Sequence, residues 1–278
     1  MASNPPGECC TKGFRHGATG SGAEPQPPEA LTDPTIDCHK RKTLTIETEG
    51  EASGKTVDFG GIASYIVGDQ SSKNVLLFLP DVFGHEFINS QLLADQYAEA
   101  GYLVVLPDIF KGDTILARQN GPAFDFAKDW LPHHTPEKTR PDIDTVYEEI
   151  VKKYAPTYIT AVGYCFGAKY AIQLLGEKKV HAVAVFHPSF VTIDEIRAIK
   201  GPLFIAGAET DTIYTEELRK QTEATLKEIK ATYFTTLASG VEHGFAVRGD
   251  ITNPIVKFAK EKAFCDAVAW FKQSFPKN

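Results

Sequence analysis

One short turn constrains the fold of this chain more than any other feature. It reads Gly-Tyr-Cys-Phe-Gly at residues 163–167 and directly follows an apolar run at 157–162 that is typical of a buried strand. In a nucleophile elbow a strand turns sharply into a helix, flanking glycines relieve the crowding, and the middle side chain is held up at the sheet edge. The turn therefore predicts a strand, then Cys165, then a helix.

The middle residue of this turn is a thiol rather than a hydroxyl. A thiolate is intrinsically nucleophilic, and the N-terminus of a helix lowers the pKa of a thiol placed there. A lone buried cysteine is more often a small apolar core residue. Because the turn is flanked by glycines between a strand and a helix, we favour Cys165 as a nucleophile.

The remaining pattern predicts one α/β domain with a mostly parallel central sheet covered by helices on both faces. Short β-rich runs alternate with longer helical ones, as such sheets require. Strands are expected at 62–67, 75–79, 103–106, 158–162, 182–186, 203–206 and 232–236, with a further strand near 44–47. Helices are expected at 86–100, 142–154, 166–175, 215–229 and 255–274. The domain is expected to span residues 41–278.

Two segments lack such periodicity. Residues 1–40 are rich in Gly, Pro, Ser and Thr, and we expect an irregular N-terminal extension there. Residues 112–140 form the least regular part of the domain, and we expect them to run over the sheet as a lid.

Charge and cysteine content exclude several classes of protein. A net charge of −7 argues against a nucleic-acid partner, and no apolar run is long enough for a membrane span. Five cysteines without framework spacing and no secretory signal predict a reducing, cytoplasmic location. Cys9, Cys10 and His16 lack a fourth metal ligand at suitable spacing, so we expect neither a metal nor a cofactor.

An acid and a base follow the elbow in the order that α/β-hydrolases use. Asp211 comes after the strand at 203–206, and His243 lies in a glycine-flanked loop before the last helix. His243 would take the proton of Cys165 while Asp211 holds the imidazole in the right tautomer. Glu209 is a rival acid, and Asp211 could instead cap the helix expected near residue 215.

Negative charge on an attacked carbonyl oxygen needs hydrogen-bond donors. We expect them to be the backbone N–H groups of Phe166, at the helix start, and of Val82, in the loop at 80–84. His187 ends the strand at 182–186 and His85 follows the loop, so both are candidate walls of a substrate pocket.

As a set, these motifs resemble the dienelactone hydrolases (carboxymethylenebutenolidases). The segments that carry the resemblance are Val-Gly-Tyr-Cys-Phe-Gly at 162–167, Pro-Asp-Val-Phe-Gly at 80–84, Leu-Pro-Asp-Ile-Phe at 106–110 and His-Gly-Phe-Ala at 243–246. It covers roughly residues 60–275 and is strongest to fungal members, which often begin with a segment like Pro-Gly-Glu-Cys-Cys at 6–10.

The resemblance implies a single domain with the α/β-hydrolase fold. It also implies a hydrolase that opens a lactone, or cleaves a small activated ester, through a thioester acyl-enzyme. In bacterial members a glutamate near the oxyanion loop holds the resting thiol, and Asp81 stands at the matching place here. Members also hold a substrate carboxylate with arginines. Arg248 lies one residue later than that pattern, where an ordinary surface charge is the alternative, and Lys111 is the cation beside the second position.

Two other functions remain open on the sequence. A glutamine amidotransferase also uses a Gly-x-Cys-x-Gly turn, but it expects a late His-x-Glu pair, whereas Gly244 and Phe245 follow His243 here. The chain could instead be a catalytically weak small-molecule binder or redox sensor in which Cys165 is oxidised. The expected partner is a small lactone or ester, and the expected state is a monomer or weak homodimer.

Overall fold

An eight-stranded sheet runs through the molecule in the order β1-β2-β4-β3-β5-β6-β7-β8. The computed structural model describes residues 51–119 and 121–274. The strands are β1 (Lys55–Phe59), β2 (Ile62–Val67), β3 (Asn74–Leu79), β4 (Leu103–Pro107), β5 (Tyr158–Tyr164), β6 (Ala182–Phe186), β7 (Leu203–Thr210) and β8 (Tyr233–Glu242). β1 pairs antiparallel with β2, and β2 with β4, while every other pairing is parallel. The expected α/β-hydrolase fold is therefore confirmed.

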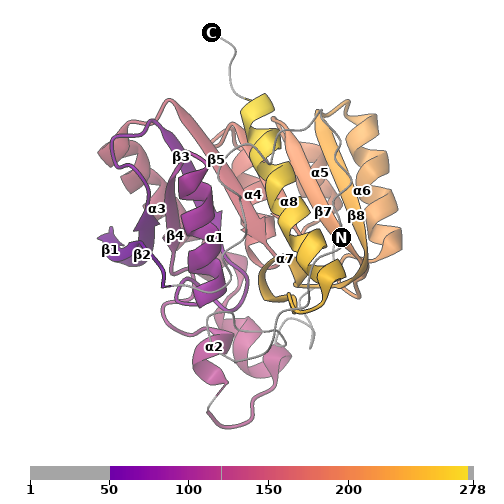
Figure 1. Cartoon of the computed structure of the whole chain (residues 1–278), viewed down its shortest axis with the longest axis horizontal. Coiled ribbons are helices and arrows are strands. Elements are labelled where there is room, and N and C mark those ends of the chain that lie inside the picture. Colours follow the sequence, from indigo (N-terminus) through magenta and orange to yellow (C-terminus); the bar gives the residue numbers. More distant parts are fainter. Residues whose placement is uncertain (1–50, 120, 275–278) are drawn as a thin grey trace.

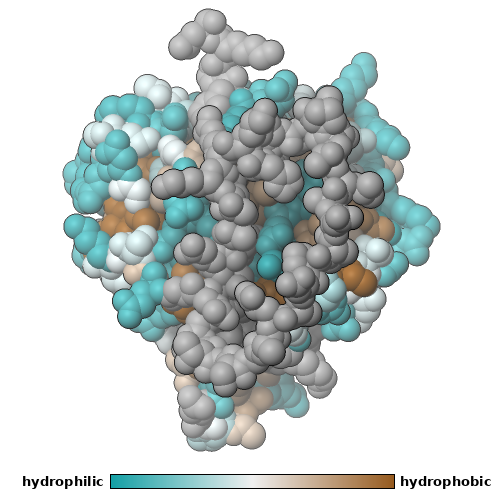
Figure 2. Space-filling model, in the orientation of Figure 1, coloured by the Kyte–Doolittle hydropathy of each residue, from teal (hydrophilic) through white to brown (hydrophobic). Residues whose placement is uncertain are grey.

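Helices cover both faces of the sheet (Figure 1). The helices are α1 (Ile88–Glu99), α2 (Ile115–Arg118), α3 (Pro136–Tyr154), α4 (Gly167–Gly176), α5 (Ile193–Ala198), α6 (Glu216–Glu228), α7 (Phe245–Arg248) and α8 (Pro254–Gln273). In Figure 1, α1 and α8 lie in front of the sheet, whereas α3, α4 and α5 lie behind it. Figure 2 shows mostly hydrophilic residues over α6 on the right flank, as expected for a helix with one solvated face. In the part of the chain described here, no helix is both long and apolar enough to cross a membrane.

The parallel strands end together at one edge of the sheet. Leu79 of β3 pairs with Gly163 of β5, and Phe186 of β6 pairs with Ala206 of β7. In open α/β sheets ligands bind outside the carboxyl ends of the strands. The residues that directly follow these strands therefore share the place where a site is expected.

The structure contains elements that the sequence did not predict, and it moves the start of one predicted helix. The sequence analysis missed β1. This strand lies at the outer edge of the sheet, most of its side chains are exposed, and its sequence contains no apolar run. A second missed element is α5, a six-residue helix that begins with a capping box between Thr192 and Glu195. Helix α3 begins at Pro136 rather than 142, because Pro141 lies inside the helix instead of marking its start.

Other expectations lie outside the described residues or are confirmed. The irregular extension at 1–40 and the strand near 44–47 fall outside the described part of the chain. Helix α8 begins as its sequence predicts, with the Asn253 side chain accepting a hydrogen bond from the N–H of Ile255 and a proline in the first turn.

Candidate active site

The elbow holds Cys165 in a strained backbone conformation at the end of β5. Its φ is 49°, in the left-handed region that non-glycine residues rarely adopt. The glycines on either side have no room for a side chain. A Cβ on Gly163 would lie 2.6 Å from Cα of Ala168, and one on Gly167 would overlap the carbonyl oxygen of Leu79. The elbow therefore requires both glycines.

Backbone hydrogen bonds fix the elbow from both sides. The N–H of Cys165 donates to the carbonyl of Phe186 (3.0 Å), and the carbonyl of Cys165 accepts from the N–H of Ser189 (3.0 Å). On the other side, the N–H of Gly167 donates to the carbonyl of Pro80 (3.1 Å). The loop after β3 and the start of α4 are thereby joined, and Cys165 lies between them and the β6 loop.

His243 and Asp211 form a buried pair at the ends of β8 and β7. His243 Nδ1 lies 2.9 Å from Asp211 Oδ2, and each side chain is 1% exposed. The other oxygen of Asp211 accepts hydrogen bonds from the N–H groups of Ile213 (2.8 Å) and Tyr214 (2.9 Å). The rival acid, Glu209, is exposed and accepts from the N–H of Gly240 instead.

Cys165, His187 and His243 bring their sulfur and one ring nitrogen each within 4.8 Å of one another, and all three are buried. Burial by itself would lower the pKa of His243, but the neighbouring charges of Cys165 and Asp211 outweigh it and raise the pKa to about 10. The surroundings of His243 therefore favour its charged form beside the thiol.

His187 presents a second imidazole to the same thiol. Its ring packs edge-on against that of His243, with the centroids 4.9 Å apart. Burial lowers the pKa of His187 to about 4, an effect that the nearby Cys165 only partly offsets. The neutral form therefore dominates at neutral pH. Neither ring nitrogen of His187 makes a hydrogen bond of normal geometry to a residue in the described part of the chain.

Ser189 is a neighbour of the thiol that the sequence analysis missed. Its buried hydroxyl lies 3.3 Å from Cys165 Sγ. The available signal was its place two residues beyond His187 in the loop that follows β6, because that loop shares the sheet edge with the elbow. Serine is too common in loops for this signal to have singled it out.

The two expected oxyanion donors lie beside the elbow. Phe166 is the N-cap residue of α4, and Val82 follows β3 in the loop that Gly167 contacts. The carbonyl of Val82 accepts from the N–H of Ile115, but within the described ranges neither Val82 nor Phe166 uses its own N–H in a backbone hydrogen bond. Their role as oxyanion donors stays a prediction.

Asp81 and Arg248 form a second buried pair. Arg248 Nε donates to Asp81 Oδ2 (2.8 Å), while Asp81 Oδ1 accepts from the N–H of Phe83 (3.0 Å). The guanidinium also lies over the ring of Phe83, 5.0 Å from its centroid. Burial raises the pKa of Asp81, and Arg248 partly opposes this. Arg248 is 2% exposed, which rules out a solvated surface charge.

Lys260 of α8 is a buried cation that the sequence did not reveal. Its Nζ donates to the carbonyl of Val247 in α7 (3.0 Å), which also accepts from Asn89 Nδ2 (2.9 Å). Burial lowers the pKa of Lys260 to about 7, although the charge of Asp81 opposes the shift. The two donors attach to the one-turn helix that follows His243 and carries Arg248, so they fix its position.

Lys111 and His85, the two remaining candidates for substrate contact, each lie beside an aspartate. Lys111 Nζ is 3.2 Å from Asp142 Oδ2, and its side chain is 69% exposed. His85 is buried, with Nδ1 3.7 Å from Asp108 Oδ1. The structure thus pairs each of them with an aspartate.

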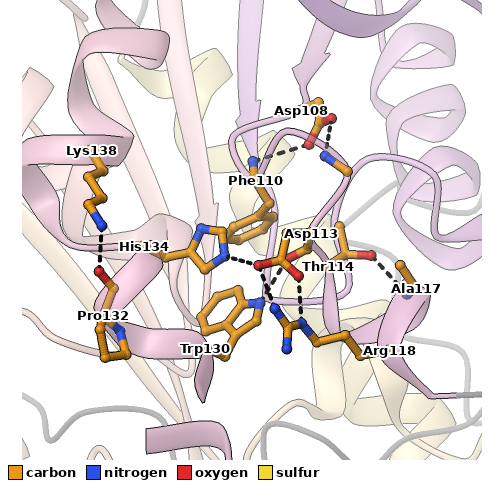
Figure 3. Close-up of polar contacts among 11 residues, drawn as sticks. Asp108, Phe110, Asp113, Thr114, Ala117, Arg118, Trp130, Pro132, His134 and Lys138 are labelled. Atoms are coloured by element: carbon orange, nitrogen blue, oxygen red, sulfur yellow. Dashed lines mark hydrogen bonds and ion pairs between the residues drawn. The ribbon is translucent and has the colours of Figure 1, made fainter. Parts of the chain in front are cut away.

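The segment that follows β4 forms a structured excursion below the sheet in Figure 1, with α2, a π-helical turn (Phe126–Trp130) and a 3-10 turn (Leu131–His133). Asp113 is its centre (Figure 3). The carboxylate of Asp113 accepts two hydrogen bonds from Arg118 and lies 3.0 Å from His134 Nε2, and its carbonyl accepts from Trp130 Nε1 (2.7 Å). We call the described residues of this excursion, 112–119 and 121–135, the lid.

Aromatic side chains connect the lid to the elbow. The buried Trp130 ring lies 5.3 Å from that of Phe110 and 5.8 Å from that of Phe166, centroid to centroid. Phe110 and Phe166 are themselves 5.1 Å apart. Phe166, which directly follows Cys165, is thus in aromatic contact with the lid.

The sheet order, the elbow after β5 and the loops after β7 and β8 define the molecule as an α/β-hydrolase. Known proteins give the same result at the level of fold. A dienelactone hydrolase structure from Klebsiella pneumoniae, described as putative, superimposes with a TM-score of 0.65 at 16% identity, covering 79% of this chain and 98% of that one.

Sequence comparison narrows the class. The model of the dienelactone hydrolase family matches residues 62–275. The Aspergillus violaceofuscus protein named hydrolase pyvD is 35% identical over 279 residues and 100% of both chains. "Dienlactone hydrolase 1" of Gibberella moniliformis is 31% identical and covers 80% of this chain and 88% of its own. The chain therefore belongs to the dienelactone hydrolase family.

Proposed function

We propose that this protein hydrolyses a lactone or a small activated ester by means of a Cys165-His243-Asp211 triad. The Cys165 thiolate attacks the carbonyl carbon and forms a C–S bond. The carbon–oxygen bond to the leaving alkoxide then breaks, and the alkoxide takes its proton from the His243 imidazolium. In a lactone that alkoxide stays attached as a hydroxyl of the thioester.

Water completes the cycle. His243 removes a proton from the water that attacks the thioester carbon, and collapse of the tetrahedral intermediate expels the Cys165 thiolate and releases the carboxylic acid. The N–H groups of Val82 and Phe166 would stabilise the oxyanion in both halves. Asp211 would keep the proton of His243 on Nδ1, so that Nε2 faces the thiol.

The observation that carries this proposal is the buried 2.9 Å contact between His243 Nδ1 and Asp211 Oδ2, beside a thiol at the strained position of an elbow. Both partners lie at strand ends in hydrolase order. The family membership supports the same chemistry, since two curated relatives from Gibberella moniliformis carry the name dienlactone hydrolase.

The buried ion pair between Asp81 and Arg248 supports a second part of the proposal. We propose that Asp81 restrains Cys165 in the resting enzyme and that Arg248 binds a carboxylate of the substrate. The observed ion pair between them would then exchange for an ion pair between Arg248 and substrate. His187, His85 and Lys111 stay proposals as residues that contact substrate, as do a cytoplasmic location and a monomer or weak homodimer.

The direct test is Cys165→Ala. We expect it to abolish turnover of an aryl ester and of dienelactone while circular dichroism and thermal unfolding stay close to wild type, because alanine removes only the sulfur. Cys265→Ala, a half-buried thiol on α8, is the matched control and should retain full activity. Unchanged turnover by Cys165→Ala would refute the assignment.

The rival functions predict other outcomes. A glutamine amidotransferase would release ammonia from glutamine, which the pairing of His243 with an aspartate from the preceding strand does not favour. A redox sensor would leave Cys165 unacylated by ester but oxidised to sulfenic acid by peroxide.

A further inference from the structure

Three potential metal ligands meet at the thiol. Cys165 Sγ and one nitrogen each from His187 and His243 lie within 4.8 Å of one another, in a buried position at the ends of β5, β6 and β8. The triad chemistry uses only two of these groups. His187 is the third, and no step of the proposed hydrolysis needs a second imidazole beside the sulfur.

The state of His187 suits a ligand rather than a general base. The residue is fully buried, and neither ring nitrogen has a hydrogen-bond partner of normal geometry within the described ranges. A buried polar atom without such a partner carries a desolvation cost that a ligand could relieve. The lone pair of a neutral imidazole is a donor that transition metals commonly bind.

His243 already has the outer contact that metal-bound histidines show. Such histidines usually donate their other N–H to a carboxylate, which fixes the tautomer and raises the basicity of the ligating nitrogen. Asp211 Oδ2 lies 2.9 Å from His243 Nδ1, leaving Nε2 on the other side of the ring, and Nε2 makes no hydrogen bond of normal geometry within the described ranges.

The required rearrangement is small. Zinc binds thiolate at about 2.3 Å and imidazole at about 2.0–2.1 Å, so ligating atoms around a tetrahedral ion lie about 3.4–3.6 Å apart. Contraction from 4.8 Å or less therefore needs shifts of about 1 Å, which side-chain rotations can supply. A thiolate with two imidazoles is a donor set that zinc prefers, and water would fill the fourth position.

We propose that Cys165, His187 and His243 form a reversible inhibitory site for a thiophilic divalent cation such as Zn²⁺. Binding requires the thiolate and a neutral His243, so the one proton that this pair shares is released into solvent. The ion is not a resident cofactor: it occupies the nucleophile and the base, and a chelator restores activity. The inhibition rests on the proposed function, whereas the binding site itself does not.

The test measures binding before activity. The full chain, with Cys9, Cys10 and Cys38 replaced by serine to remove competing thiols, is titrated with Co²⁺, and a thiolate-to-cobalt charge-transfer band in the near ultraviolet reports a Cys ligand. Zn²⁺ then competes for the site, which gives its affinity. The variants are Cys165→Ala, His187→Gln and His187→Phe, with Cys265→Ser as control.

We expect one ion per chain, a thiolate band that Cys165→Ala abolishes and Cys265→Ser retains, and Zn²⁺ affinity at least about 100-fold weaker in both His187 variants, since loss of a second-shell partner alone costs about 10–100-fold. Glutamine and phenylalanine pack differently in place of His187. A loss of Zn²⁺ affinity in both variants would therefore be caused by loss of the imidazole nitrogen rather than by altered packing. Absence of the band, or unchanged affinity in either His187 variant, would overturn the site.

The two proposals fail separately. If Co²⁺ binds through Cys165 but metal-free Cys165→Ala hydrolyses ester at the wild-type rate, the cation site stands and the hydrolase assignment fails. If metal-free Cys165→Ala is inactive but the wild type shows no thiolate band, the opposite holds.

Discussion

Replacing Asp211 by asparagine should cost this enzyme far more than the loss of one charge. Asp211 Oδ1 accepts two backbone N–H bonds, from Ile213 and Tyr214, so the amide oxygen of the introduced asparagine would keep that place. Its NH₂ group would then face His243 Nδ1, 2.9 Å from the carboxylate oxygen in the wild type, and could only donate. The imidazole would be forced to carry its proton on Nε2, where it can no longer accept the proton of Cys165.

The magnitude follows from two effects. Loss of a charge-assisted hydrogen bond costs about 1.5–3 kcal/mol. In a serine protease triad the corresponding change combines this loss with the wrong tautomer, and together they lower kcat about 10⁴-fold. We therefore expect kcat to fall by about 10²–10⁴-fold, or roughly 3–5 kcal/mol. The pKa of His243, about 10 in the wild type, should fall as well, because Asp211 is one of the charges that raise it.

The assay is steady-state hydrolysis of p-nitrophenyl acetate by the wild type, Asp211→Asn and Asp211→Ala. Alanine removes the acceptor without forcing the tautomer, so it should be less damaging than asparagine. Glu209→Gln is the matched control, since Glu209 is exposed and accepts a hydrogen bond from the N–H of Gly240 rather than contacting His243. The reasoning is refuted if Asp211→Asn retains activity close to wild type, or if Glu209→Gln is equally impaired.

Two further predictions concern the support of the site. Gly167→Ala should destabilise the fold by several kcal/mol in urea unfolding, because its Cβ would overlap the Leu79 carbonyl oxygen; a cost below about 1 kcal/mol would contradict the close approach. Lys260→Met should raise the free energy of unfolding at pH 7. The pKa of Lys260 falls from 10.5 to about 7 on folding, so the cost of its buried charge is complete below pH 7 and disappears as the pH rises toward 10.5. The advantage of Lys260→Met, a few kcal/mol at most, should therefore shrink between pH 7 and pH 9.5, and an equal gap at both would refute the assigned cause.

The sequence predicts those parts of the site that depend on local order along the chain. Cys165, Asp211 and His243 follow strands whose apolar runs are visible, and parallel strands bring their carboxyl ends to one edge. The two glycines of the elbow could also be predicted, because the turn between the strand and the helix leaves no room for a side chain at either position.

The missed features depend on contacts between distant segments. Lys260 stands among charged residues in the sequence of α8, which suggests an exposed side chain. Its amine is buried because α7 packs against α8 and the carbonyl of Val247 accepts its hydrogen bond. Ser189 meets the thiol because β6 lies beside β5. The pairing of Asp81 with Arg248 joins residues 167 positions apart, so neither sequence neighbourhood indicates it.

The most direct test of the central claim is mass spectrometry of the intact protein, followed by peptide mapping, after rapid quenching with a slowly hydrolysed lactone or aryl ester. The account predicts a transient adduct with the mass of the acyl group, located on the peptide that contains Cys165 and absent from Cys165→Ala. An acyl group on another residue, or turnover without any adduct on Cys165 under conditions that trap thioesters, would contradict it.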